Sequence, residues 1–269
     1  MSIWQADFHQ RSLPSTQEII WELIICDSTG RLILHSSCPQ QQATHDWLTA
    51  QLSKATAEKI PEKIQVFRPQ FLNLMALAAD NLQLQVEATP RTPALKSLIK
   101  EYLGNTAISL EVEKNPPQAL PENLWGENWR FGRLAAGELI DLFGDRPIPI
   151  RHMPKDLMPI KLGLSCEIPI PGLVIYGGRK SMRLVRWLAS QNPIAINFIP
   201  LETARSGGLV LESNLCDRWI LATFEDKEAA ISAARFEEQK KVTQNLHFLL
   251  VQPDDSDMTF TGFWLLQNS

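Results

Sequence analysis

The stretch Ile19–His35 reads IIWELIICDSTGRLILH and consists of two apolar runs separated by a turn sequence. The four residues Asp27–Gly30 combine Asp, Ser and Gly, which favour turns, and the flanking runs are rich in Ile and Leu. A strand, a turn and a second strand in succession predict a β-hairpin. The apolar segment Ile3–His9 predicts another strand before the hairpin.

Helical and extended patterns alternate after the hairpin. Apolar residues recur at helical spacing in Thr44–Ala57 and in the segment that begins at Pro69, and a third helix is predicted at Pro93–Leu103. Strands are predicted at Lys63–Arg68 and Leu82–Glu87. The order strand, strand, strand, helix, strand, helix, strand, helix is that of the ribonuclease H-like fold, although element order alone is weak support for a fold.

A proline-rich segment, Asn115–Pro121, predicts a stiff linker, because adjacent prolines favour extended backbone and cannot enter a helix interior. We therefore predict an N-terminal α/β domain at residues 1–113, a linker at 114–124 and a C-terminal α/β domain at 125–269. Beyond the linker we predict a short helix, then a proline-spaced run that is irregular or edge-strand in character, and then a mixture of strands and two longer helices. In chain order these elements are Glu138–Phe143, Arg146–Pro171, Leu173–Tyr176, Arg179–Ser190, Ile194–Pro200, Leu209–Glu212, Arg218–Phe224, Lys227–Thr243, His247–Gln252 and Thr259–Leu266. Mixed α/β is therefore the predicted fold class of the whole chain.

Composition restricts the partners that the chain can have. The 269 residues are 44% hydrophobic, which is enough for a substantial core, and the formal net charge is -4. Affinity for nucleic acid comes largely from Lys and Arg that neutralise phosphates, so an acidic chain of this kind is not expected to coat nucleic acid indiscriminately. Any RNA site is expected to be a local patch.

Several other classes of site lack support in the sequence. The four cysteines contain no CxxC pair, which favours reduced thiols over a disulfide framework or a zinc site. The paired glycines Gly177-Gly178 and Gly207-Gly208 match neither a phosphate-binding P-loop nor the dinucleotide fingerprint, and Asp254–Asp257 lacks the Gly and closing Glu of a calcium loop. We expect no cofactor, no metal and, since no apolar stretch approaches the roughly 20 residues of a membrane helix, no membrane insertion.

One window is strongly basic. Between Arg146 and Trp187 the chain has eight Lys or Arg residues against two acidic residues, a net charge of +6 within a chain of net charge -4. Such a concentration predicts a phosphate-binding face, although a solvated surface stretch has the same composition. The basic candidates in this window are Arg151, Lys155, Arg179, Lys180, Arg183 and Arg186.

The predicted helix after Gly177-Gly178 sharpens this prediction. At about 100° per residue, Arg179, Arg183 and Arg186 fall on one face and the apolar residues fall opposite. The free N–H groups at the start of this helix also favour phosphate, whereas the alternative interpretation is an ordinary tight turn followed by a surface helix.

Aromatic side chains next to arginines suit single-stranded RNA, whose bases stack on aromatic rings and guanidinium planes. The candidates are three tryptophans and two further arginines, namely Trp125, Trp129, Trp187, Arg130 and Arg133. Most tryptophans are core residues, and Trp4, Trp21, Trp219 and Trp264 lie in apolar strands, which favours the core for them.

Four short stretches carry a resemblance to a known family. They are Trp21–Leu23 (WEL), Arg218–Ala222 (RWILA), Leu246–Leu249 (LHFL) and Trp264–Leu266 (WLL). With the opening IWQADFHQR, they make the chain similar, from Ile3 to Leu266, to the Tab/Atab family of cyanobacterial and plastid RNA-binding proteins. Those proteins are needed for translation of the messenger for one of the reaction-centre proteins of photosystem I.

The resemblance implies an RNA partner, single-stranded mRNA, and a role in photosystem I biogenesis, but it brings no residue-level mechanism. Because the similar block begins at Ile3, without a preceding plastid transit peptide, we expect a bacterial and cytoplasmic location. We expect a non-enzymatic RNA-binding protein.

Two alternatives remain at the level of sequence. The first is a scaffold that docks translation factors or photosystem assembly factors through the same charged face. The second is a metal-dependent nuclease in which Asp7 and Glu22, on adjacent strands, would hold magnesium. Arg68 argues against the nuclease, because it places a cation at the end of the fourth strand, where another metal ligand is expected.

Overall fold

The computed structural model describes residues 2–12, 18–103, 110, 112–200 and 206–268. The chain divides into two compact units, with the boundary in the sequence between Lys114 and Asn115. We call them the N-terminal unit and the C-terminal unit. Both combine sheets with helices, so the predicted mixed α/β fold class is confirmed. None of the described helices is long and apolar enough to cross a membrane.

The N-terminal unit contains one five-stranded sheet in the order β3-β2-β1-β4-β5. The first three strands pair antiparallel, whereas β4 pairs parallel with β1 and with β5. The strands are β1 (Ile3–Ser12), β2 (Ile19–Asp27), β3 (Leu32–Pro39), β4 (Lys63–Val66) and β5 (Gln85–Ala88), and the helices are η1 (Gln40–Gln42), α1 (His45–Thr56), α2 (Pro69–Asp80) and α3 (Pro93–Leu103). The predicted hairpin and the three predicted helices are confirmed. The ribonuclease H-like assignment, which rests on this element order, stays a prediction.

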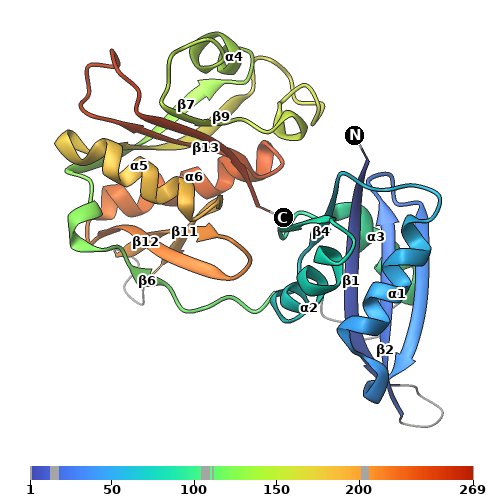
Figure 1. The fold of residues 1–269 in the computed structure, drawn as a ribbon. Helices are drawn as coiled ribbons and strands as arrows, with labels where there is room; N and C mark the ends of the chain where they lie inside the picture. The colour runs from blue at the N-terminus through green and yellow to red at the C-terminus, as the bar shows by residue number, and fades with distance from the viewer. Residues whose placement is uncertain (1, 13–17, 104–109, 111, 201–205, 269) are drawn as a thin grey trace. The chain divides into compact units, whose positions relative to one another are not determined.

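Local sequence explains where these helices begin and which face of the sheet they cover. The Thr44 side chain accepts a hydrogen bond from the Trp47 backbone N–H and caps α1, and Pro69 occupies the first turn of α2. Alternate residues of β1 and β2 point to opposite faces. Phe8 therefore packs with α1 and α2, while Ile24 packs with α3 on the other face (Figure 1).

The C-terminal unit contains two sheets. One has the order β7-β9-β13-β14-β8 and the other has the order β10-β11-β12-β6. Their strands are β6 (Gln118–Ala119), β7 (Asn128–Ala135), β8 (Ile150–His152), β9 (Pro169–Tyr176), β10 (Pro193–Pro200), β11 (Gly207–Ser213), β12 (Asp217–Phe224), β13 (Leu246–Gln252) and β14 (Gly262–Gln267). The helices are η2 (Glu122–Leu124), α4 (Glu138–Phe143), η3 (Lys155–Leu157), η4 (Gly178–Lys180), α5 (Ser181–Ser190) and α6 (Lys227–Val242).

The largest core of the C-terminal unit lies between its two sheets, with α5 and α6 packed into it (Figure 1). A second core covers the other face of the five-stranded sheet and includes α4. The predicted linker contributes to the first core, since β6 pairs with β12 and the side chains of Leu120 and Leu124 are buried there.

Strand β10 lies at an edge of its sheet, and its outer backbone groups are satisfied by side chains. The Ile196 N–H donates to His247 Nε2 at 2.8 Å, and the Ile196 carbonyl accepts from Lys240 Nζ at 2.6 Å. The Phe198 N–H donates to Glu237 Oε1 at 2.7 Å, and Lys240 also lies 3.0 Å from that carboxylate. An edge strand that would otherwise leave buried polar groups unpaired is thus joined to β13 and α6.

Sequence reasoning missed strand β7. The first half of this strand, NWRF, alternates polar and apolar residues at period 2, which is the signal of a half-buried strand, but the alternation breaks at Gly132. Other predicted elements are confirmed with shifted ends. The α-helical part of the predicted Arg179–Ser190 helix begins at Ser181, and the last strand begins at Gly262 instead of Thr259.

The closure of the β10 edge generates a prediction for stability. Replacing Lys240 with Met removes a buried ammonium group. The Ile196 carbonyl then loses the hydrogen bond from Lys240 Nζ, and the Glu237 carboxylate loses its ion pair with Lys240. We expect Lys240→Met to lower the free energy of unfolding by about 3 kcal/mol, in the range for breaking a buried charge pair. Urea denaturation measures this change.

Lys241→Met is the matched control, because the neighbouring Lys241 side chain is exposed and the substitution is chemically the same. We expect it to change the free energy of unfolding by less than about 0.5 kcal/mol. Equal stability of the two variants would show that the edge of β10 does not depend on Lys240.

Candidate nucleic-acid interface

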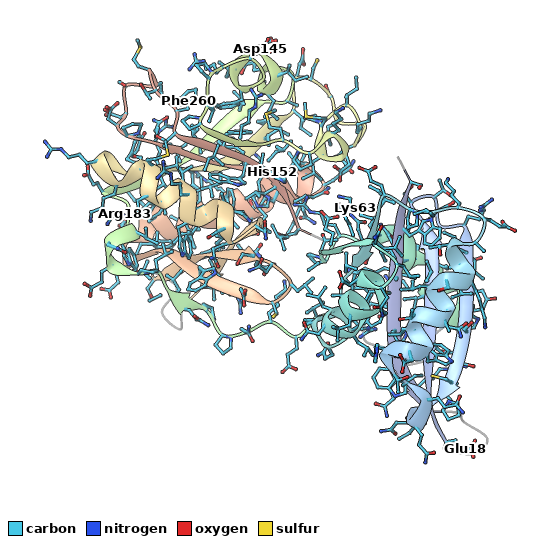
Figure 2. The ribbon with its side chains drawn as sticks, in the orientation of Figure 1. Glu18, Lys63, Asp145, His152, Arg183 and Phe260 are labelled. Atoms are coloured by element: carbon cyan, nitrogen blue, oxygen red, sulfur yellow. The ribbon has the colours of Figure 1, made fainter. Side chains whose placement is uncertain are left out.

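Four cations predicted to bind phosphate lie together on one helical segment. Arg179 and Lys180 belong to the 3-10 turn η4, and Arg183 and Arg186 belong to α5. All four side chains are exposed, and Figure 2 marks Arg183 on this helix. Among the residues that the structure describes, none of these four forms an ion pair. We call these four residues the α5 ridge.

The opposite side of α5 fixes the direction of the ridge. Leu184, Val185 and Leu188 are at most 1% exposed and lie in the core between the two sheets. Burying each of these three side chains contributes roughly 1.5–3 kcal/mol to the stability of the fold. Burial of this apolar side therefore decides how the helix is oriented. Helix α5 is therefore held with its cations outward, as the amphipathic pattern predicted.

The start of this helical segment is less suited to phosphate than the sequence suggested. Gly178 has a φ of +53°, and a Cβ at this position would overlap the Glu127 carboxylate. An acidic side chain thus lies against the first turn and competes with any other anion. The exposed flank of the helix is therefore a better candidate for phosphate binding than its N-terminus.

The remaining basic candidates of the window do not join the ridge. The Arg151 guanidinium donates to the backbone carbonyls of Phe143 and Gly144, where α4 ends, so its donors complete a helix C-terminus. Lys155 is exposed in η3. The net charge of the window therefore does not form one continuous face.

The three candidate tryptophans are all half-buried and pack against the large core. The Trp125 Nε1–H donates to the Leu120 carbonyl at 3.0 Å. The Trp187 ring meets Trp219 edge to face at 5.1 Å, and the Trp129 ring lies 5.6 Å from Phe224. Each ring already has protein contacts, so only its exposed part remains for a base.

Trp219 and Trp21, which we expected in the core, are likewise half-buried, whereas Trp4 and Trp264 are fully buried.

Strand β7 separates its two candidate arginines. Successive residues of a strand alternate between faces, so Arg130 and Arg133 point to opposite sides of the sheet. The Arg130 Nε–H donates to the Tyr176 hydroxyl, and its Nη2 lies 3.8 Å from the Asp257 carboxylate. Arg133 instead faces α6 and lines a pocket with Arg235, a residue that sequence reasoning missed.

The local sequence of α6 explains why Arg235 was missed. The helix reads KEAAISAARFEEQKKV, in which acidic and basic residues alternate without a local excess of positive charge. Its strand partner lies about one hundred residues earlier in the chain, and strand β7 itself was not predicted. The only signal was the spacing of Ser232, Arg235 and Gln239 along one face of the helix.

A buried charged cluster occupies the N-terminal unit. Asp7 and His9 share one face of β1, and the register places His9 beside Glu22 of β2. These three side chains are 0–4% exposed. The His9 ring lies between the two acids, with its Nδ1 3.1 Å from Asp7 Oδ2 and its Nε2 3.5 Å from Glu22 Oε2.

Each acid of this cluster also meets an arginine. The Arg68 Nε–H donates to Asp7 Oδ1 at 2.7 Å, and Arg11 Nη2 lies 2.9 Å from Glu22 Oε1. The sequence placed the Arg68 cation where a nuclease would carry a further metal ligand, and the structure brings this cation onto the carboxylate itself. Within the described ranges, no group of three or more His, Cys, Asp or Glu side chains has an arrangement that could hold a metal ion.

All four cysteines are unpaired. Burial raises the pKa of the Cys26 thiol to about 12, and the neighbouring Asp27 carboxylate contributes to this increase. Cys166, the only cysteine within the basic window, is exposed.

Comparison with known protein families matches both halves of the chain. Residues 3–102 match the model described as RNA-binding protein Tab2/Atab2 N terminal, and residues 107–267 match RNA-binding protein Tab2/Atab2, C-terminal domain. "Protein TAB2 homolog, chloroplastic" of Arabidopsis thaliana is 28% identical over 282 residues, which cover 98% of this chain and 74% of that protein. The protein of the same name from Zea mays is 25% identical, and the match covers 98% of this chain and 70% of that protein.

Two solved structures show a weak likeness. A simian T-cell lymphotropic virus intasome in complex with the B56 gamma regulatory component of PP2A gives a TM-score of 0.28 and 18% identity, covering 38% of this chain and 37% of that one. The Mos1 transposase catalytic domain with Raltegravir and Mn gives a TM-score of 0.28 and 14% identity, covering 40% and 62%. Likeness at this level carries no argument about fold or activity.

The ion pairs of the buried cluster generate a stability prediction. Asp7→Asn removes the negative charge that faces Arg68, whose side chain is only 19% exposed. Because the half-buried Arg68 guanidinium then loses its ion pair with the buried Asp7 carboxylate, we expect the free energy of unfolding to fall by about 2–3 kcal/mol. Urea denaturation measures the change, and Asp80→Asn, at an exposed position at the end of α2, is the control with little expected effect.

The nuclease alternative assigns the buried cluster a catalytic role instead of a structural one, and it predicts cleavage of RNA. Labelled RNA incubated with the protein and Mg²⁺ would be cleaved, and both Asp7→Asn and Glu22→Gln would abolish the cleavage in protein that remains folded. That result would contradict a purely structural role for the cluster.

Proposed function

Since the chain belongs to the Tab2/Atab2 family of RNA-binding proteins, we propose that it binds RNA through the α5 ridge of its C-terminal unit. The observation that supports this site is the exposure of Arg179, Lys180, Arg183 and Arg186 along one helix, without ion pairs in the described part of the chain. In a chain of net charge -4, such a group of cations provides a local field for a polyanion.

The chemistry of binding follows from phosphate neutralisation. Each guanidinium or ammonium group that meets a phosphate releases condensed counterions, and this release drives association. Arginine is well suited to the task because its planar fork can donate two parallel hydrogen bonds to one phosphate. The ridge supplies three arginines and one lysine.

We further propose that the RNA is single-stranded. Trp187 adjoins Arg186 at the outer side of α5 and is half-buried, so part of its ring is available to a base. Stacking on an aromatic ring contributes roughly 1–3 kcal/mol per base and is open only to bases outside a duplex.

The cellular role that we propose is promotion of translation and biogenesis of photosystem I, without an enzymatic step. Support for the photosystem comes from the family resemblance of the sequence. Both relatives compared above are described as chloroplastic, and the bacterial cytoplasmic location expected from the sequence stays a prediction.

Neutralising the α5 ridge tests the proposed RNA site. In the variant Arg179→Gln, Lys180→Gln, Arg183→Gln, Arg186→Gln, we expect affinity for labelled single-stranded RNA to fall at least about tenfold. The slope of log affinity against log salt should become shallower by up to about 3, since each lost phosphate contact on a single strand contributes about 0.7. Fluorescence anisotropy at several salt concentrations measures both quantities.

The matched control makes the same change in net charge at four exposed lysines elsewhere, Lys54→Gln, Lys59→Gln, Lys161→Gln and Lys241→Gln. We expect its affinity to stay within about threefold of the unmodified protein. An equal loss in both variants would show that only the net charge matters, and an unchanged affinity in the first variant would remove the ridge as the RNA site. A duplex that binds as tightly as the single strand would count against the preference for single strands.

A further inference from the structure

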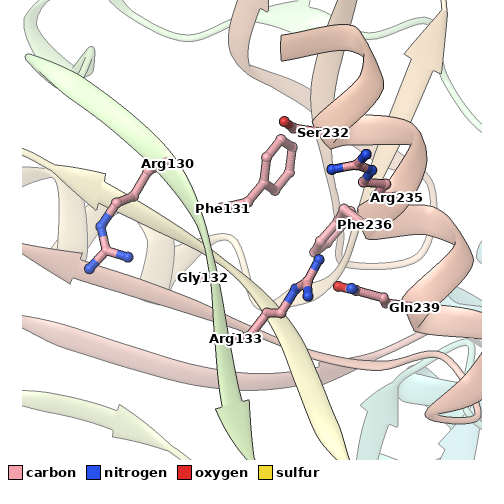
Figure 3. A pocket seen from close by; sticks show the side chains of 8 residues that line it. All are labelled: Arg130, Phe131, Gly132, Arg133, Ser232, Arg235, Phe236 and Gln239. Atoms are coloured by element: carbon pink, nitrogen blue, oxygen red, sulfur yellow. The ribbon is translucent and has the colours of Figure 1, made fainter. Parts of the chain in front are cut away.

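A pocket of about 310 Å³ lies between strand β7 and helix α6 in the C-terminal unit. Strand β7 is an edge strand of the five-stranded sheet, and Figure 3 shows the side chains that line the pocket. The lining residues come only from these two elements and are Arg130, Phe131, Gly132, Arg133, Ser232, Arg235, Phe236 and Gln239. No Asp or Glu is among them.

Two guanidinium groups converge on this pocket. Arg133 reaches from β7 and Arg235 reaches from α6 toward the space between them, whereas Arg130 points to the other side of the strand (Figure 3). Both Arg133 and Arg235 are exposed, and across the described ranges neither has an ion pair. Two like charges directed at one space repel each other unless an anion lies between them, so their convergence favours an anionic ligand.

The fold holds these two side chains on rigid elements. Alternation along β7 places Phe131 and Arg133 on the face that meets α6. In α6, Phe236 is 2% exposed, and its ring lies 5.2 Å from that of Phe131. This contact fixes the strand against the helix, so the two arginines stand opposite each other without rearrangement.

The other polar groups of the pocket are compatible with phosphate. The Ser232 hydroxyl and the Gln239 amide stand at helical spacing on either side of Arg235, and both can donate hydrogen bonds. Because β7 is at the edge of its sheet, one row of its backbone N–H groups also faces away from β9. Phosphate oxygens are strong acceptors that arginine binds in a bidentate manner.

We propose that the pocket of Arg133 and Arg235 binds a phosphate group. This pocket is a second anion site in addition to the α5 ridge, and the inference rests on the proposed RNA binding where the phosphate belongs to the RNA backbone. The same chemistry would accept the phosphate of a free nucleotide, and the two sources are separated by experiment.

The test uses the full chain and the double variant Arg133→Gln, Arg235→Gln. For labelled single-stranded RNA we expect an affinity loss of about tenfold and a salt slope shallower by about 1.4, since two phosphate contacts are lost. Titration calorimetry with adenosine monophosphate provides the second arm, in which binding by the unmodified protein should be lost in the variant. Both guanidinium groups are exposed, so thermal unfolding should be unchanged and serves as the check on folding.

The variant Lys161→Gln, Lys241→Gln is the matched control, because it makes the same change in net charge at two exposed residues that do not line the pocket. We expect it to bind RNA and nucleotide within about twofold of the unmodified protein. The variant Arg133→Lys, Arg235→Lys keeps both positive charges. Compared with the Gln variant, it should recover part of the salt dependence of RNA binding but not the full affinity.

Each outcome bears on the pocket separately from the α5 ridge. Weakened RNA binding in the double variant assigns the pocket to backbone phosphate, and lost nucleotide binding with unchanged RNA affinity assigns it to a free nucleotide. Unchanged binding of both ligands would overturn the pocket while RNA binding through the ridge stands. Absence of RNA binding in the unmodified protein would instead contradict the proposed function.

Discussion

The C-terminal unit depends on how the outer edge of β10 is satisfied. Within this edge the Ile196 N–H and carbonyl are bonded by His247 of β13 and Lys240 of α6, and the Phe198 N–H is bonded by Glu237. His247 accepts at Nε2, so its Nδ1–H donates to the Asn245 carbonyl at 2.8 Å. One imidazole thus ties together the two sheets. Unsatisfied backbone groups at this depth would cost roughly 1–3 kcal/mol each, which makes the pairing of the sheets a condition for the core between them.

That core in turn sets which side chains remain outside. Helix α5 contributes Leu184, Val185 and Leu188 to it, and α6 contributes Phe236. Each helix is then oriented by its apolar side, and the arginines of the ridge and the pocket are left on the surface with no counter-ion among the described residues. The basic character of these surfaces is therefore a consequence of packing as much as of composition.

Features that sequence could predict are those encoded within one element. The amphipathic pattern of α5 was sufficient to predict both its burial and its ridge, and the turn at Asp27–Gly30 was sufficient to predict the hairpin. Features that join distant segments were not predicted. The pocket of Arg133 and Arg235 needs strand β7, which was missed, and it needs α6 to lie beside that strand. The role of Arg151 also escaped prediction, although the Phe143 and Gly144 carbonyls that it contacts are only eight and seven residues away, because the proline-spaced run around it has no periodic pattern that gives the direction of its side chain.

The charged clusters of the two units differ in burial and in ion pairing, and this difference bears on where a polyanion is expected to bind. In the N-terminal unit, Asp7 and Glu22 are buried and each lies against an arginine, with His9 between them. A cation held by a buried carboxylate has already exchanged its hydration for a fixed partner, so it gains little from a phosphate and would have to break an ion pair to meet one. In the C-terminal unit the exposed arginines of α5 and of the pocket keep their hydration and have no such partner in the described structure. Phosphate neutralisation is favourable for cations of this second kind and not for those of the buried cluster, which is why we propose the RNA site on the C-terminal unit, where four exposed cations are grouped on one helical segment.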